Sequence, residues 1–394
     1  MATRTELKSN IWKYNAFNFM RNFIFSIPII AIFFLENGLD LRQIMIIEAV
    51  FAVTVVMFEI PSGYFADRHG RKLSMVIGSA ALFIASLIFL FSADFIGFMI
   101  GEIVWGIGAS FASGADSALI YDTLAQLKQK KQYKKVEGHA QFIARISEGT
   151  ASLAGGVMAI ISTRITFLAT AIAFFFMIFL CISLKEPKTK AVIVREGHVK
   201  NMYKILRFAL HRNKVVKWLI VYSAIIALFG VVAFWFSQPY FKLVGLPIVY
   251  FGALFAVAGV VTGLASKYAH IYEKKIGLKA AIISLPIIAM ISLFFIGKFV
   301  FLFSIIFFLG VEFVRGIEFP LVRDLMNKIV WPQNRATILS VSNLIGRLLF
   351  VIFAPLFGWF ADLYTIPTAF YLLSGSMFIF GAITLSMMHY HKAV

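Results

Sequence analysis

Ionisable side chains inside long apolar runs are the residues of this chain that could do chemistry. Seven acids and four arginines lie in such runs: Glu48, Glu59, Glu102, Asp116, Glu148, Glu312 and Glu318, with Arg21, Arg145, Arg315 and Arg347. A carboxyl group removed from water either pairs with a cation or takes up a proton, so these positions suit proton or cation binding. The excess of acids favours a cationic or zwitterionic ligand, although some acids must be counter-ions of the arginines.

Four acids are candidates for proton or cation binding. Asp116 and Glu318 come first, because each lies about two helical turns inside the end of its apolar run. The alternative for both is an ion pair with a neighbouring arginine. Glu148 follows Arg145 by three residues and shares its helix face, so it either binds a proton or neutralises Arg145. Glu102 either controls access to a binding site or faces water.

Polar and aromatic side chains in the same runs could bind a small organic ligand. Glu312, Arg315 and Glu318 are spaced by three and predict a charged stripe on one helix face. Arg21 could hold a carboxylate, either of a ligand or of an internal acid. The candidate ligand-binding residues are Asn18, Arg21, Arg145, Trp235, Gln238, Glu312, Arg315 and Arg347. For Trp235 there is a second interpretation, an anchor at the membrane interface.

No cofactor site is predicted. Cys181 is the only cysteine, the histidines show no metal-ligand spacing, and no glycine-rich phosphate loop is present. No nucleophile and base can be paired either. We therefore expect no metal, no cofactor and no enzymatic activity.

The elements that position these residues are membrane helices. The 394-residue chain has a mean hydropathy of +0.87 and is 60% hydrophobic and only 14% charged. A helix needs about 20 apolar residues to cross a bilayer. Twelve runs reach this length: 11–35, 41–66, 73–93, 95–122, 138–161, 164–184, 215–241, 247–271, 277–297, 299–325, 335–361 and 366–389. Every third run is essentially free of ionisable residues and should face lipid, whereas the others should enclose an aqueous cavity.

The chain divides at its longest polar segment. We predict a six-helix bundle at residues 1–184, a basic cytoplasmic linker at 185–214 and a second six-helix bundle at 215–394. An offset of 202 residues matches charged residues between the halves: Asp116 with Glu318, Asp122 with Asp324, and Arg145 with Arg347. An all-α polytopic membrane protein follows, with two pseudo-symmetric, parallel bundles of six transmembrane helices around a central cavity.

Positive charge is distributed asymmetrically along the chain, whose formal net charge is +18. Cations concentrate at the N-terminus, after the second run, at Lys128 to Lys135 and from Lys185 to Lys217, all on one side of the membrane. This pattern predicts N- and C-termini in the cytoplasm, an integral protein of the cytoplasmic (inner) membrane, and attraction to anionic lipids. It argues against nucleic acid as a partner.

A decapeptide between the second and third runs carries the most specific signal. Its charged residues are Asp67, Arg68, Arg71 and Lys72. Gly63 and Gly70 should allow the tight backbone of a short hairpin, and the cations should hold it on the cytoplasmic side. Orientation alone requires only the cations, so the acid among them indicates a charge lock.

This decapeptide resembles, in every defining position, the loop motif between helices two and three of the major facilitator superfamily. The twelve spans, the basic central segment and the repeat extend the resemblance over the whole chain. It implies alternating access, with Asp67 steadying the outward-open state against the start of helix eleven near Thr337, and Arg71 paired with Asp122. The residues of this conformational lock would be Glu59, Gly63, Asp67, Arg68, Gly70, Arg71, Lys72 and Asp122.

Within the superfamily, the pattern is closest to bacterial drug/proton antiporters, with two departures. Glu102 stands four residues before Gly106, where exporters often carry an arginine, so an arginine-based proton relay is not expected. Gly155 and Gly156 match the small residues of helix five, but the proline that often precedes them is absent.

The expected function is secondary active transport of a small organic solute, with proton-coupled export of a cationic or amphipathic compound. The alternative is a proton-coupled symporter that imports a zwitterionic or anionic nutrient, with Arg21, Arg145 or Arg347 binding its carboxylate. A membrane-embedded enzyme or a non-transporting sensor on the same fold is a different class. The expected partners are the solute, protons and membrane lipids, and the resemblance implies a monomer.

Overall fold

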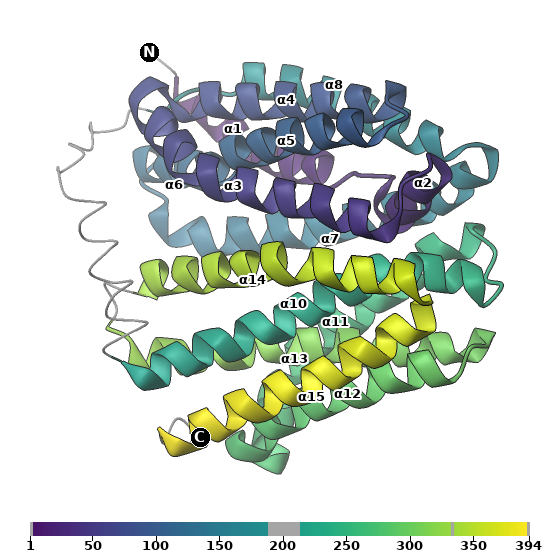
Figure 1. Cartoon of the computed structure of the whole chain (residues 1–394). Coiled ribbons are helices and arrows are strands. Elements are labelled where there is room, and N and C mark those ends of the chain that lie inside the picture. Colours follow the sequence, from purple (N-terminus) through teal and green to yellow (C-terminus); the bar gives the residue numbers. More distant parts are fainter. Residues whose placement is uncertain (1–2, 188–212, 332–334, 392–394) are drawn as a thin grey trace. The chain divides into compact units, whose positions relative to one another are not determined.

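The computed structural model describes residues 3–187, 213–331 and 335–391, which are almost entirely helical and contain no strand (Figure 1). Apolar runs of this length form helices because a helix satisfies all of its own backbone hydrogen bonds without water. The predicted linker lies largely outside the described residues.

The first part of the chain contains the following elements: α1 (Arg4–Arg21), the 3-10 turn η1 (Ile27–Ile29), α2 (Ile30–Glu36), α3 (Leu41–His69), α4 (Arg71–Phe91), α5 (Phe95–Ala112), α6 (Ala115–Gln126), η2 (Lys130–Gln132), α7 (Tyr133–Ile161) and α8 (Thr163–Ser183). The predicted first span corresponds to α1 and α2, and the predicted fourth span to α5 and α6. The other four predicted spans correspond to one helix each.

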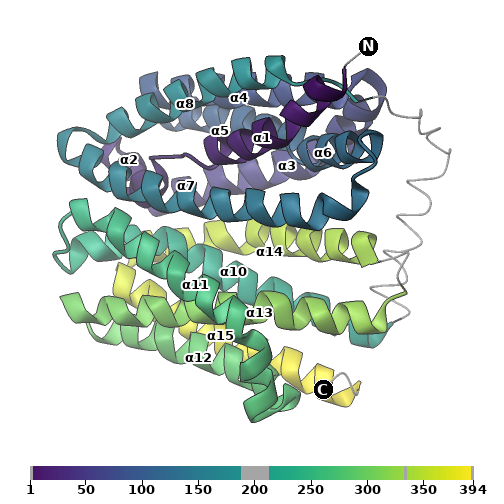
Figure 2. The ribbon, with the colours of Figure 1, turned by 180° about the vertical axis from the view of Figure 1, so that it is seen from behind.

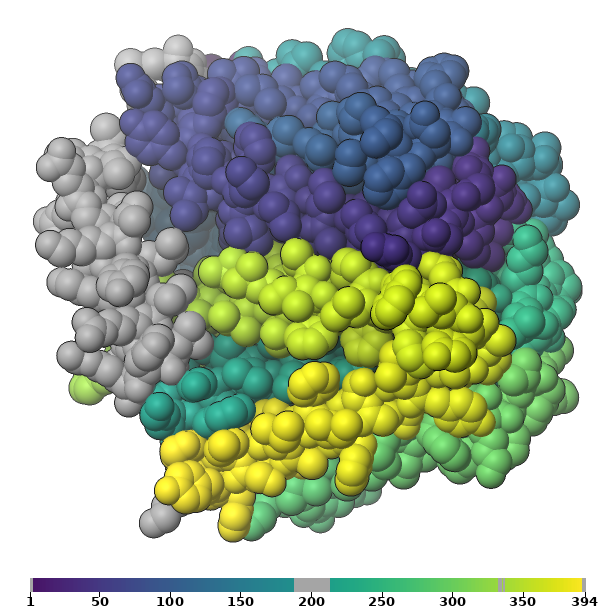
Figure 3. Space-filling model, viewed as in Figure 1, coloured from purple at the N-terminus to yellow at the C-terminus, as the bar shows by residue number. Residues whose placement is uncertain are grey.

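The second part contains α10 (Lys214–Leu243), α11 (Val249–Ile276), α12 (Leu278–Lys298), the 3-10 turn η4 (Leu302–Ile305), α13 (Ile306–Ile329), α14 (Arg335–Leu363) and α15 (Ile366–Tyr390). Each coincides with a predicted span. Helix α10 packs against α13, α14 and α15, and its side chains are seen between those of α14 and α15 in Figure 3.

Two compact units are formed by the described residues. The first takes in the described parts of Met1–Leu39, Val50–Ile193 and Ile248–Ala256, and the second those of Asp40–Ala49, Val194–Pro247 and Val257–Val394. The predicted boundaries at 184 and 215 stay a prediction.

Helix breaks in the first unit place polar backbone inside two membrane spans. Helix α1 ends at Arg21, and the non-helical stretch that follows it is anchored where the Phe25 amide donates to Thr170 Oγ1 at 3.1 Å. The second break separates α5 from α6 at Gly114, whose φ of +79° suits glycine. Non-helical backbone at membrane depth is tolerated where protein or water satisfies it, so both breaks point to a polar interior.

Nine helices in the described residues are long and apolar enough to cross a membrane. The spans that fall outside this set are the broken first span, α7 and α13. The first span is divided between the polar α1 and a short apolar helix, whereas α7 and α13 carry the Arg145 and Glu148 pair and the acids of α13, which lower their apolar character. Helices of this kind line a protein interior or a wet cavity.

Gly63 does not have the role expected of it. It lies inside α3, six residues before the helix ends, and it does not adopt a positive φ. Gly70 alone makes the turn of the hairpin, with φ +105° between α3 and α4. The expectation for Gly63 was wrong because the helix continues to His69, and hydrogen bonds of a continuing helix require no special backbone freedom.

Candidate functional site

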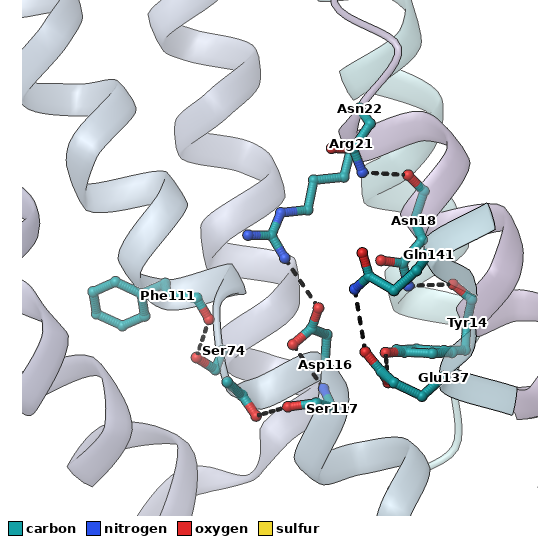
Figure 4. Close-up of polar contacts among 11 residues, drawn as sticks. Tyr14, Asn18, Arg21, Asn22, Ser74, Phe111, Asp116, Ser117, Glu137 and Gln141 are labelled. Atoms are coloured by element: carbon teal, nitrogen blue, oxygen red, sulfur yellow. Dashed lines mark hydrogen bonds and ion pairs between the residues drawn. The ribbon is translucent and has the colours of Figure 1, made fainter. Parts of the chain in front are cut away.

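Asp116 lies in the first turn of α6, directly after the break at Gly114. Its Oδ2 accepts a hydrogen bond from Arg21 Nη1 at 3.0 Å, and its Oδ1 accepts the Ser117 amide at 2.6 Å. Figure 4 shows Arg21 extending from the end of α1 toward this carboxylate. A guanidinium and the N-terminus of a helix both favour the ionised acid. Asp116 thus forms the ion pair with an arginine that was the alternative to proton binding.

Helices α1 and α7 lie side by side (Figure 2), and a polar network joins them beside this pair (Figure 4). Tyr14 Oη donates to Glu137 Oε2 at 2.6 Å, and Gln141 Nε2 donates to Glu137 Oε1 at 3.3 Å. The amide of Asn18 donates to the Tyr14 carbonyl at 2.9 Å. Sequence reasoning missed Glu137, although it lies eight residues before Arg145 in the same helix. The Tyr14–Glu137 bond joins the middle of α1 to the beginning of α7.

Glu312 of α13 has both carboxylate oxygens occupied. Arg315 Nη1 donates to Oε1 at 2.6 Å, and Thr262 Oγ1 of α11 donates to Oε2 at 2.9 Å. The acid is 6% exposed. Thr262 was not among the sequence candidates, because a lone threonine in an apolar run gives no signal of its own.

Glu318, three residues after Arg315, has a different environment. It is 7% exposed, Ser223 of α10 lies beside its carboxyl group, and its Oε1 is buried without a hydrogen-bond partner among the described residues. The predicted stripe thus separates into one ion pair and one acid, since Arg315 bonds to Glu312. A buried carboxyl oxygen without a partner is costly unless a proton, a water molecule or a ligand reaches it.

Arg145 and Glu148 of α7 form an ion pair at 2.6 Å between Nη1 and Oε2. The Arg145 side chain is 73% exposed, and that of Glu148 is 34% exposed. The structure therefore contains the mutual neutralisation that the spacing allowed. The guanidinium still has donors available, because one carboxylate oxygen occupies only one of its five N–H groups.

The remaining candidates differ in their burial. Glu102 is 5% exposed, so the interpretation that it faces water is wrong. Trp235 is 5% and Gln238 is 0% exposed on α10, and Trp235 contacts Phe234 edge-on. An interfacial anchor must reach the headgroup region, so the anchor interpretation of Trp235 is also wrong. Arg347 is half-buried on α14.

The hairpin motif is held by charge contacts within the first unit. Arg71 forms an ion pair with Asp122 of α6, as the resemblance implied, and its Nη1 also donates to the Ala118 carbonyl at 2.6 Å. Glu186, which the sequence analysis missed, accepts the backbone amides of Arg71 at 2.9 Å and Lys72 at 2.7 Å. It caps the N-terminus of α4, whose own N-cap residue is a glycine without a side chain.

Other members of the motif are exposed in the described structure. Asp67 and Glu59 are exposed, and Arg68 makes only a long contact of 3.4 Å with the Tyr64 hydroxyl. Exposed charges at a helix end are free to exchange partners when neighbouring segments move. Their roles in a conformational lock stay predictions.

The comparisons with known proteins identify the family. The sequence profile described as Major Facilitator Superfamily matches residues 14–354, so the chain belongs to the major facilitator superfamily. An uncharacterized MFS-type transporter, YxaM of Bacillus subtilis (strain 168), is 22% identical over 358 residues, which are 89% of this chain and 88% of that protein. An uncharacterized transporter of Buchnera aphidicola subsp. Schizaphis graminum is 35% identical over 103 residues, 26% of each chain.

Solved structures show the same fold. A mutant of the nucleoside transporter NupG superposes with a TM-score of 0.80 at 12% identity, over 98% of this chain and 99% of that one. A bacterial homologue of the human lysosomal transporter Spinster gives 0.75 at 13% identity, over 99% and 98%. The D-xylose-proton symporter gives 0.70 at 16%, over 99% and 97%. The protein is thus an integral membrane transporter of the MFS fold with a small-molecule substrate.

No group of three or more histidine, cysteine, aspartate or glutamate side chains that could hold a metal ion occurs in the described residues. The side chains that the described structure brings together form ion pairs and hydrogen bonds, and their carboxyl groups are able to bind protons.

Proposed function

We propose that this transporter exports a cationic or amphipathic organic compound in exchange for protons, and that proton and substrate compete for Glu318. The observation that carries the proposal is the buried Oε1 of Glu318, which has no hydrogen-bond partner among the described residues. A proton on the carboxyl group removes its charge, and a bound organic cation compensates that charge instead. One carboxyl group can hold only one of the two, which is the basis of exchange.

Local pairing of three other candidate acids supports the choice of Glu318. Arg21 pairs with Asp116, Arg145 with Glu148 and Arg315 with Glu312. Each pair is electrically neutral as long as it is intact. A ligand or proton that bound there would first have to break a charge-assisted hydrogen bond, which costs more than occupying an unpaired oxygen.

Purified protein in sealed liposomes tests the proposal, with tetraphenylphosphonium and ethidium as probes and an imposed pH gradient as the driving force. We expect Glu318→Gln to lose proton-driven probe flux, because the amide cannot bind and release a proton. Asp324→Asn is the matched control on the same helix, since Asp324 is an exposed partner of Lys328 at 2.6 Å. Full proton-driven flux in Glu318→Gln would contradict the proposal.

A second candidate function is proton-coupled import of a carboxylate, and the exposed guanidinium of Arg145 favours it. The D-xylose-proton symporter has the same fold, so the fold accommodates import. Ligand-induced thermal stabilisation separates the candidates. Stabilisation by organic cations that weakens at low pH supports exchange. Stabilisation by carboxylates that strengthens at low pH and is lost in Arg145→Gln supports import.

A further inference from the structure

The internal repeat matches Asp116 with Glu318. Each of these acids lies near a residue from the first helix of its half, but the two residues differ in type. Arg21 of α1 pairs with Asp116, and Ser223 of α10 lies beside Glu318. The partners are 95 residues apart in both units. Arg21 and Ser223 are thus related by the same offset of 202 residues that relates Asp116 to Glu318. The internal repeat therefore provides two copies of one site that differ at one position, arginine against serine.

In the first unit, this site compensates a negative charge. Asp116 receives a guanidinium, a backbone amide and the N-terminus of α6, which begins only one residue before it. All three favour the ionised carboxylate and oppose the burial of the group and the nearby charge of Glu137, which favour the protonated form.

In the second unit, the same position supplies no cation to the acid. Glu318 lies inside α13 and not at its N-terminus, so no free helix amides face it. Ser223 offers a neutral hydroxyl, and the neighbouring Tyr222 of α10 directs its own hydroxyl to the Ile282 carbonyl at 2.8 Å. Arg315, the cation on the same helix, bonds to Glu312 and favours the ionised form of Glu318 only through its nearby charge.

We propose that the residue at this repeat position decides which unit carries the coupling proton. Ser223, which carries no charge, leaves Glu318 able to bind and release a proton, whereas Arg21 holds Asp116 as its ionised counter-ion. This inference rests on the proposed proton coupling at Glu318. It adds that arginine at position 223 should abolish proton binding at Glu318, and that loss of the arginine at position 21 should allow proton binding at Asp116.

Infrared difference spectroscopy between two pH values tests this without any substrate, because a protonated carboxyl group has its own C=O stretching band. We expect the wild-type protein to show a titrating carboxylic acid band that is lost in Glu318→Gln. Ser223→Arg should lose the same band by pairing Glu318 with a cation. Arg21→Gln should gain a second band, and Arg21→Gln with Asp116→Asn should lose that second band again.

The outcomes separate the inference about positions 21 and 223 from the proposed proton coupling at Glu318. A wild-type band that persists in Ser223→Arg, or no added band in Arg21→Gln, overturns the inference while proton coupling at Glu318 stands. A band that survives Glu318→Gln overturns both. Ser223→Arg places a long side chain in a packed site, so if it does not fold, Arg21→Gln decides alone. Ser223→Ala is a matched control that removes the hydroxyl without adding charge, and it should keep the band.

Discussion

The Arg21–Asp116 pair joins a largely buried carboxylate to a partly exposed guanidinium. The Asp116 side chain is 10% exposed and that of Arg21 is 29% exposed. Removing one partner of a buried pair costs about 3 to 5 kcal/mol, because the other charge stays buried without compensation. Partial hydration of Arg21 should reduce that cost.

We predict that Asp116→Asn lowers the free energy of unfolding by about 1 to 3 kcal/mol, somewhat less than for fully buried pairs. Arg21→Gln combined with Asp116→Asn should be less destabilised than the sum of the single variants, because no unpaired charge remains. Unfolding in detergent followed by tryptophan fluorescence measures all three. Strictly additive losses would show that the two residues do not interact in solution.

At the scale of elements, the breaks decide where polar groups can enter a membrane helix. Gly114 ends the apolar part of its span and gives Asp116 a place in the first turn of a new helix. Helix ends elsewhere are closed by side chains from distant segments. The Asp362 carboxylate near the end of α14 accepts the amides of Leu41 at 3.0 Å and Arg42 at 2.7 Å within the second unit, which satisfies the first turn of α3.

Substitution of Gly114 tests whether the break between α5 and α6 depends on a backbone conformation that favours glycine. A Cβ at this position meets no atom within 4 Å, so the cost of Gly114→Ala is that of the positive φ alone, about 1 to 2 kcal/mol. Gly138 in α7 also has open space, but its helical backbone suits alanine, so Gly138→Ala should be neutral or stabilise by about 0.4 to 1 kcal/mol. Thermal unfolding of both variants checks the difference. Equal effects would show that the break at Gly114 relaxes without strain.

For the whole molecule, we propose cytoplasmic N- and C-termini, a monomer in the cytoplasmic membrane, and contact of the basic segments with anionic lipid. The cations from Lys128 to Lys135 follow α6 and should lie inside. Short segments at the other ends of the helices, such as the one that contains Ala93, should lie outside.

Labelling of single cysteines tests this orientation in a Cys181→Ser background, because Cys181 is buried and is the only cysteine. We expect Ala93→Cys, an exposed position, to react with a membrane-impermeant maleimide in intact cells. Gln132→Cys, also exposed, should react only after the membrane is opened. The reverse pattern would place the basic segments outside and contradict the charge rule.

Much of the fold was predictable because membrane helices are encoded locally. An apolar run of sufficient length must form a helix in lipid, so each of the twelve predicted spans coincides with one helix or two consecutive helices. The Arg71–Asp122 pair was also predicted, since the hairpin motif fixes both positions by resemblance. Gly63 and Trp235 were misinterpreted. The residues around Gly63 do not show that the helix continues past it, and those around Trp235 do not show that its side chain is buried in a bundle.

The sequence by itself determined the class of this protein, its apolar spans, its hairpin motif and the set of acids and arginines that could carry protons or ligands. The tertiary structure decided which charges neutralise each other, and it left Glu318 with a buried oxygen that has no hydrogen-bond partner within the part of the chain that the structure describes. Glu186 caps α4 across 115 residues, and Arg21 reaches Asp116 across 95. Such partners come from helices that meet only after folding, and a carboxyl group's preference for a charge or a proton depends on those neighbours and not on its own segment.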